Sequence, residues 1–349
     1  MTADRRQHLG AEAACPPSFL WHEQIGISWL GISRACAGDD AEAAGVAAAD
    51  ALGAAAAPRS AGAACAGDTG FAGADPAAPE FRGGLSARAG GVSPVPWDSL
   101  DLGLRTGDDP ARVAENLALL ARATGVDLPR AARISLEHGA RVRLATGSGM
   151  AGAGDALVTT LPGLPLALTV ADCFPLFLAA PGAVALAHCG WRGIAAGVAP
   201  ATLAALCRAA GCDPSAARAW IGPGIGPCCY SLPEATACVF PEIARGAREE
   251  SDAAGGGASR STAGPAEGAQ ASLGGDPCRP SPAALAVDLA AWLRAQLAAA
   301  GIPAERIATS GLCTSCRAEW FYSHRRDRGK TGRMLAWIEA LAPAGAALR

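Results

Sequence analysis

Residues 170–193 read VADCFPLFLAAPGAVALAHCGWRG and contain two reactive side chains, each at the end of an apolar run. Cys173 follows one short apolar run, and His188 ends a second run directly before Cys-Gly-Trp-Arg-Gly. Short apolar runs bounded by glycine and proline are typical of buried strands. The stretch therefore predicts buried strands that bring a thiol and an imidazole to strand ends, where α/β proteins gather their functional residues.

The segments on either side of this stretch predict further strands and helices. DALVTT and LPLALTV are two more apolar, strand-like runs. DDPARVAENLALLARATG has apolar residues at helical spacing, with a start signal at Asp109-Pro110 and a stop at Gly125. Two further helices are expected in GIAAGVAPATLAALCRAAG and PAALAVDLAAWLRAQLAAAG. This mixture favours one α/β or α+β domain from about residue 80 to residue 345.

Two segments have low sequence complexity. Residues 1–79 are dominated by alanine and glycine, and we expect a mostly disordered extension because large apolar groups are too few to offset the entropy of ordering. Within it, IGISWLGIS fits either a strand or a turn of helix. A second segment at about 247–283 predicts a flexible insertion in the ordered domain.

Composition excludes several classes of protein. The net charge of −3 and a pI near 6.0 do not indicate a nucleic-acid-binding surface. No apolar run approaches the roughly 18 residues of a membrane span. The cysteines number 13, an odd count spread over 349 residues, and the N-terminus does not resemble a signal peptide. We therefore expect a cytoplasmic protein with reduced thiols.

His138, in ISLEHGARV, joins Cys173 and His188 as a third side chain where an apolar run meets glycine. One thiolate and two imidazoles are a suitable set of three protein ligands for Zn²⁺, with a fourth position open. Spacing alone leaves three alternatives: packing residues without chemistry, Cys173 as a nucleophile with His188 as its base, or a copper site, which usually adds an axial methionine.

Three other features bear on chemistry. IGPGIGPCCY, residues 221–230, lacks the Walker Lys-Ser/Thr and predicts a tight loop near the site rather than a nucleotide loop. Cys313 and Cys316 have the spacing of a redox pair, but no second pair at finger spacing accompanies them, so we expect packing thiols.

Several arginines lie beside glycines, where a guanidinium can bind two oxygens of an anion such as phosphate: Arg88, Arg192, Arg325, Arg326 and Arg333.

These segments resemble the YfiH-type family, the laccase-domain or polyphenol oxidase-like proteins that are described as purine nucleoside phosphorylases. The resemblance rests on GLSARAGGVSPVPWDSLDLGLRTGDDPARVAENLALL, LEHGARV, GDALVTTLPGLPLALTVADCFPLFLA, VALAHCGWRGIAAGV, IGPGIGPCCY and FYSHRRDRGKTGRM. They run from about 81 to 338 in the family's order. The combination of ADC with a following H-x-G-W-R-G is specific.

The resemblance implies a layered α/β sandwich with a mixed β-sheet and a single catalytic domain. It also implies that His138, Cys173 and His188 bind zinc and that Arg88 contacts phosphate. Asp172 beside Cys173 is a candidate acid or base, or a structural hydrogen-bonding residue. We assign Arg192 to substrate binding.

The implied reaction is phosphate-dependent cleavage of adenosine, inosine and S-methyl-5′-thioadenosine to the free base and a ribose 1-phosphate, with adenosine deaminase as a side activity. The expected partners are purine nucleosides and phosphate, without nucleic acid or membrane, and the expected assembly is a monomer or a homodimer. A cysteine hydrolase, a copper-dependent polyphenol oxidase and a non-catalytic zinc-stabilised protein remain alternatives.

The chain departs from the family pattern at three places near the site: Glu137 before the first histidine, Asp101 in place of an asparagine, and Cys189 in place of an alanine. Cys189 raises the question of a fourth ligand that would close the site. Adjacent residues on a strand point to opposite faces, so we expect that Cys189 and His188 do not bind the same ion.

Overall fold

The structure is a computed structural model that describes residues 18–24, 26–33, 81–233 and 284–341. Its helices are α1 (Pro110–Thr124), α2 (Trp191–Ala195), α3 (Val198–Ala210) and α6 (Leu289–Ala299), with short 3-10 turns at Leu128–Arg130, Pro214–Ala216 and Ala304–Arg306. Its strands are β1 (Ser18–Gln24), β2 (Ile27–Ser33), β3 (Phe81–Ser86), β4 (Ala132–Ser135), β5 (Val142–Leu144), β6 (Gly149–Ala153), β7 (Ala156–Thr159), β8 (Leu166–Val170), β9 (Phe174–Ala180), β10 (Ala183–Cys189), β11 (Arg218–Ile221), β12 (Ser231–Pro233), β13 (Ala284–Ala286), β14 (Ile307–Thr309) and β15 (Met334–Ala340).

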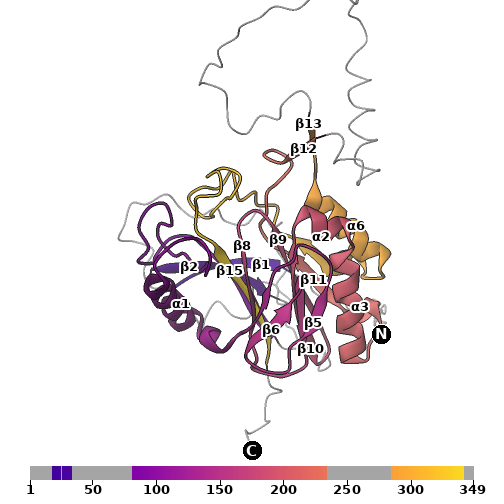
Figure 1. The fold of residues 1–349 in the computed structure, drawn as a ribbon. Coiled ribbons are helices and arrows are strands. Elements are labelled where there is room, and N and C mark those ends of the chain that lie inside the picture. The colour runs from indigo at the N-terminus through magenta and orange to yellow at the C-terminus, as the bar shows by residue number, and fades with distance from the viewer. Residues whose placement is uncertain (1–17, 25, 34–80, 234–283, 342–349) are drawn as a thin grey trace, which may run out of the picture.

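Two mixed sheets form the centre of the fold. The first has the strand order β1-β2-β3-β15-β8-β4-β6, and the second has the order β14-β11-β9-β10-β7-β5. Both contain parallel and antiparallel pairs. Helix α1 covers the outer face of the first sheet, and α2, α3 and α6 cover the outer face of the second (Figure 1). The layered α/β sandwich expected from the sequence is confirmed.

Side-chain alternation along β9 explains why this strand is buried on both faces. Leu176 and Leu178 pack in the core between the second sheet and its helices, whereas Phe177 packs between the two sheets. Residues two apart in a strand share a face, so a strand in the middle of four layers must be apolar at every position. The run FPLFLAA meets that requirement. The sandwich thus buries β9 and β10 and leaves their ends to carry the site.

The expected helix after residue 109 is confirmed, and its ends follow local rules. Asp109 caps it by accepting a hydrogen bond from the backbone N–H of Ala111 at 2.9 Å, and Gly125 ends it with a φ of 66°. The strand predictions for DALVTT, LPLALTV and AVALAHC are also confirmed, as β7, β8 and β10.

Two helix predictions need correction. GIAAGVAPATLAALCRAAG forms two helices, because Gly197 adopts a φ of 78° between α2 and α3. In PAALAVDLAAWLRAQLAAAG the first part contains strand β13, and α6 begins only after Asp288, whose carboxylate accepts the Ala291 N–H at 2.9 Å.

Strands β1 and β2 lie in the alanine- and glycine-rich N-terminal segment and extend the first sheet through β3. For IGISWLGIS the structure therefore selects the strand. The remainder of residues 1–79 and the predicted insertion at 247–283 lie outside the described residues.

Candidate active site

His138 lies in a turn after β4 that is held by one buried carboxylate. The residue has a φ of 62°, in the left-handed region that few non-glycine residues adopt. Oδ1 of Asp155 accepts the backbone N–H groups of Glu137 at 3.2 Å and His138 at 2.6 Å, and Oδ2 accepts that of Gly139 at 2.8 Å. Three hydrogen bonds to one carboxylate fix the turn and therefore the direction of the imidazole.

Cys173 lies in the connection between β8 and β9, directly after Asp172. Burial raises the pKa of its thiol to about 12, the negative charge of Asp172 adds to this effect, and the Arg333 guanidinium opposes it. The free thiol is thus neutral at pH 7 and a poor nucleophile on its own. A positive ion bound to the sulfur would be needed to favour the thiolate.

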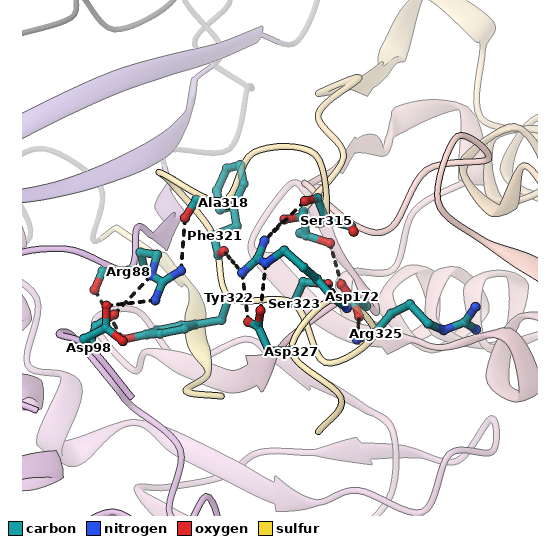
Figure 2. Close-up of polar contacts among 12 residues, drawn as sticks. Arg88, Asp98, Asp172, Ser315, Ala318, Phe321, Tyr322, Ser323, Arg325 and Asp327 are labelled. Carbon is teal, nitrogen blue, oxygen red and sulfur yellow. Dashed lines mark hydrogen bonds and ion pairs between the residues drawn. The ribbon is translucent and has the colours of Figure 1, made fainter. Parts of the chain in front are cut away.

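Asp172 holds this connection through both of its carboxylate oxygens. Oδ1 accepts the Thr314 hydroxyl at 2.7 Å, and Oδ2 accepts the backbone N–H of Arg325 at 2.6 Å (Figure 2). Its backbone carbonyl accepts the N–H of Ile225 at 2.8 Å. The residue has a φ of 82°. These contacts favour the structural hydrogen-bonding role over the acid–base role.

His188 ends β10 and is 4% exposed. Burial lowers the pKa of its imidazole to about 4, the neighbouring His138 lowers it further, and Asp155 opposes the shift. The ring is therefore neutral at pH 7, which is the form that binds metals. Its Nδ1 is buried without a hydrogen-bond partner. The neighbouring Cys189 belongs to the opposite, helix-covered core, as strand alternation requires.

His138, Cys173 and His188 converge on one side of Gly190. A Cβ atom added to this glycine would lie 3.0 Å from Cys173 Sγ, 3.6 Å from His188 Cε1 and 3.8 Å from His138 Cδ2. The two imidazole rings are 5.0 Å apart between centroids and nearly perpendicular, at 84°. The three side chains that the sequence singles out therefore surround a common space that only a glycine leaves free.

Cationic groups lie near the candidate ligands. Arg192 lies over the Trp191 ring at 4.5 Å, and Arg325 lies over the Tyr230 ring at 4.9 Å. Burial raises the pKa of Tyr230 to about 12, and the charges of Arg325 and Arg192 oppose that increase, so both arginines are within electrostatic reach of the phenol. Arg333 acts electrostatically on Cys173, while its Nη1 donates to the backbone carbonyls of Thr331 and Gly332, so three guanidinium groups lie near Tyr230 and Cys173.

Arg88 contacts the loop of residues 313–327, which also holds Asp172, but does so at Ala318. Its guanidinium donates to the Asp98 backbone carbonyl, to Asp98 Oδ2 and to the Ala318 carbonyl, each at 3.1 Å, and lies 4.9 Å over the Tyr322 ring. Figure 2 shows Arg88 at one end of this loop segment and Asp172 at the other. A cavity of about 340 Å³ adjoins Arg88 and is also lined by Asp98 and Glu319. Among the described contacts, none links Arg88 directly to the three candidate ligands.

Sequence reasoning missed three contributors to the site: Asp155, Tyr230 and Thr314. Asp155 opens the strand-like run DALVTT, and Tyr230 closes the glycine-rich loop. Each therefore had a signal in its position next to a quoted motif. Thr314 had none, because its partner Asp172 is 142 positions away in the sequence.

The fold and this site define a mixed α/β protein with a polar, metal-compatible centre at the strand ends of two packed sheets. Residues 82–340 match the family described as multi-copper polyphenol oxidoreductase laccase, and the chain belongs to this family. The resemblance to the YfiH-type proteins is thereby confirmed.

Individual relatives agree with the family assignment. Purine nucleoside phosphorylase YlmD of Geobacillus stearothermophilus is 36% identical over 75% of this chain and 92% of its own length. Purine nucleoside phosphorylase SCO2081 of Streptomyces coelicolor is 35% identical over 73% and 93% of the two chains. The solved structure of YlmD from Geobacillus stearothermophilus superimposes with a TM-score of 0.63 at 35% identity, covering 77% of this chain and 94% of that one. That of the Bacillus licheniformis YfiH protein gives 0.61 at 32% identity, with 75% and 93% covered.

Within the described ranges, no helix combines the length and the apolar character that crossing a bilayer requires.

Proposed function

We propose that the chain is a purine nucleoside phosphorylase that uses phosphate to release the base from adenosine, inosine and S-methyl-5′-thioadenosine. The observation that carries this proposal is the convergence of His138, Cys173 and His188 around Gly190, beside three arginines. Relatives over 30% identical across more than two thirds of the chain bear that name. Adenosine deaminase activity is the proposed side reaction of the same site.

The donor set fits zinc. One sulfur and two imidazoles are ligands that zinc accepts in catalytic sites, and Nδ1 of His188 is a buried nitrogen without a hydrogen-bond partner. Among the described residues, the ligand atoms of His138, Cys173 and His188 do not all lie within 4.8 Å of one another. Zinc held by His138, Cys173 and His188 would supply Lewis acidity next to the substrate.

The surrounding arginines would bind and orient the phosphate. Arg192, Arg325 and Arg333 would hold the phosphate near the thiol, since planar guanidinium groups match phosphate oxygens in pairs. Arg88 is proposed as a further phosphate contact through the donors that Asp98 and Ala318 leave free. Asp172 keeps Cys173 in position.

The test measures zinc and copper content together with phosphate-dependent release of adenine and hypoxanthine. Cys173→Ala is expected to lose one equivalent of zinc and base release, whereas Cys189→Ala, a buried neighbouring thiol in the other core, keeps both. Arg88→Ala and Arg333→Ala are compared for the phosphate KM at constant zinc content. An unchanged phosphate KM in Arg88→Ala removes that residue from the site. Full activity in Cys173→Ala overturns the proposal.

The cysteine-hydrolase alternative has a specific difficulty. An unmetallated Cys173 has a raised pKa and is mostly protonated at pH 7. That alternative predicts turnover by chelator-treated protein and its loss on alkylation with iodoacetamide. The copper alternative predicts copper rather than zinc in the same measurement of metal content.

A further inference from the structure

Four cysteines from two distant segments meet at the surface next to the candidate active site. Cys228 and Cys229 follow the glycine-rich loop after β11, and Cys313 and Cys316 follow β14. Their four sulfur atoms all lie within 4.8 Å of one another. Sγ of Cys316 is 3.4 Å from Sγ of Cys228 and 3.4 Å from Sγ of Cys229. The expectation of ordinary packing thiols does not fit this arrangement, because two of the four are exposed.

The spacing of the sulfurs fits a common central ion better than disulfides. A disulfide needs its sulfurs about 2.05 Å apart. Four thiolates at about 2.3 Å from a tetrahedral zinc ion are about 3.8 Å from one another. The observed range, from 3.4 Å to within 4.8 Å, brackets that value. Four sulfurs in one cluster also leave no open coordination position, which is the property of structural rather than catalytic sites.

The backbone around the cluster is already organised. Gly224 and Cys313 form a β-bridge, in which the Gly224 N–H donates to Leu312 and the Thr314 N–H donates to the Gly224 carbonyl at 3.0 Å. The backbone N–H of Gly226 donates to Cys313 Sγ at 3.2 Å. An N–H directed at sulfur stabilises a thiolate ligand. Two chain segments are therefore paired before any ion binds.

The two segments that carry these cysteines also hold the active-site residues. Thr314, between Cys313 and Cys316, donates its hydroxyl to Asp172, and Ile225 donates its N–H to the Asp172 carbonyl. Tyr230 directly follows Cys229. Figure 2 shows the contact from the 313–327 segment to Asp172. An ion that joins the two segments would hold the connection that carries Cys173.

We propose that Cys228, Cys229, Cys313 and Cys316 form a second, structural metal site, a tetrathiolate centre for zinc. This site is separate from the site at Cys173, because the two share no ligand. The proposal therefore does not depend on the proposed function. Soft thiolate ligands in a tetrahedral arrangement select zinc over hard cations such as magnesium. The ion fastens the loop after β11 to the loop after β14.

The first test uses the Cys173→Ala full-length protein, so that the other proposed site contributes nothing. This protein is expected to retain about one equivalent of zinc and, after exchange for cobalt(II), to show intense thiolate-to-cobalt charge-transfer absorption. Adding Cys228→Ser and Cys316→Ser should abolish both. The matched control adds Cys207→Ser and Cys212→Ser, a pair of free cysteines at the end of α3, and should keep both.

A second test needs no variant and covers the case in which the serine variant fails to fold. In the native wild-type protein, Cys228 and Cys316 should resist iodoacetamide despite their exposure, and treatment with a strong chelator should make them reactive. Rapid labelling without chelator overturns the proposal. A Cys173→Ala protein without zinc, or one whose Cys228 or Cys229 is joined to Cys316 by a disulfide, overturns it as well. A wild-type protein that holds this zinc but releases no base counts against the proposed function only.

Discussion

A single methyl group at Gly190 tests whether His138, Cys173 and His188 work as one site. Gly190 has a φ of −80° and a ψ of 163°, extended backbone that alanine adopts without strain. The added Cβ would lie 3.0 Å from Cys173 Sγ, but at ordinary contact distances of 3.6 Å and 3.8 Å from the two imidazoles. The substitution therefore acts mainly on the thiol.

The expected magnitude follows from this overlap. Non-bonded heavy atoms are comfortable at about 3.5–4.0 Å, so the thiol must move by at least about 0.5 Å. Overpacking of this kind costs about 1–3 kcal/mol, and replacing glycine with alanine returns up to about 1 kcal/mol through the unfolded chain. We expect Gly190→Ala to fold with a small net loss of stability, about 0–2 kcal/mol. A misplacement of about 1 Å at a reacting centre can cost about 100-fold in rate, which sets the upper end of the expected loss.

The assay compares Gly190→Ala with Gly147→Ala in urea unfolding, zinc content and phosphate-dependent base release. At Gly147 an added Cβ meets nothing within 4 Å, so this control carries the same change without the contact. We expect wild-type activity in the control and a loss of up to about 100-fold, with weakened zinc binding, in Gly190→Ala. Wild-type activity and zinc content in Gly190→Ala would show that the space between the three side chains is not used.

Three further variants test the supports of the fold and the site. Asp155→Asn places an amide N–H₂ group against backbone N–H donors. We therefore expect the free energy of unfolding in urea to fall by about 1–3 kcal/mol and the zinc content to decrease. Unchanged stability and zinc content would refute the role of Asp155 in holding the His138 turn. Burial acts to raise the pKa of Asp327, but hydrogen bonds led by the Arg326 guanidinium outweigh burial and lower the pKa. The Asp327 carboxylate therefore stabilises the folded protein above its unfolded pKa of about 3.9, and this stabilisation is lost as pH falls through the lower folded pKa. Asp327→Asn should therefore be less stable than wild type at pH 7, with the difference closing below about pH 4, and a pH-independent difference would contradict this assignment. Asp288→Ala removes the N-cap of α6 and should cost about 1 kcal/mol in thermal or urea unfolding without changing base release.

The elements that the sequence predicts well are those whose signals are local. Helix α1 has its cap, its apolar spacing and its terminal glycine within one continuous segment, and both ends lie where those residues place them. The break between α2 and α3 also depends on one glycine, but GIAAGVAPA continues the apolar pattern across Gly197. Periodicity alone therefore joined two helices into one.

The candidate ligands are accessible to sequence reasoning because strand ends are recognisable. His188 and Cys173 follow apolar runs, and the structure brings both near His138. The cysteine cluster is not accessible in this way. Cys229 and Cys313 are separated by α6 and by the low-complexity insertion, and an adjacent Cys-Cys pair does not have the spacing of a finger-type site. Only the pairing of Gly224 with Cys313 joins the two halves.

The backbone of the site shows why its geometry needs long-range partners. His138 and Asp172 both adopt positive φ, at 62° and 82°, and each is a ligand candidate or the neighbour of one. Such residues cost about 1–3 kcal/mol each and persist only where surrounding contacts determine them. Asp155 provides those contacts for His138 from 17 positions away, and Thr314 provides one for Asp172 from 142 positions away. Local sequence can identify the reactive side chains, but the turns that aim them are stabilised by residues that only the folded chain brings near. Loosening the loop that carries Thr314 should therefore disturb Cys173 even though no ligand has changed.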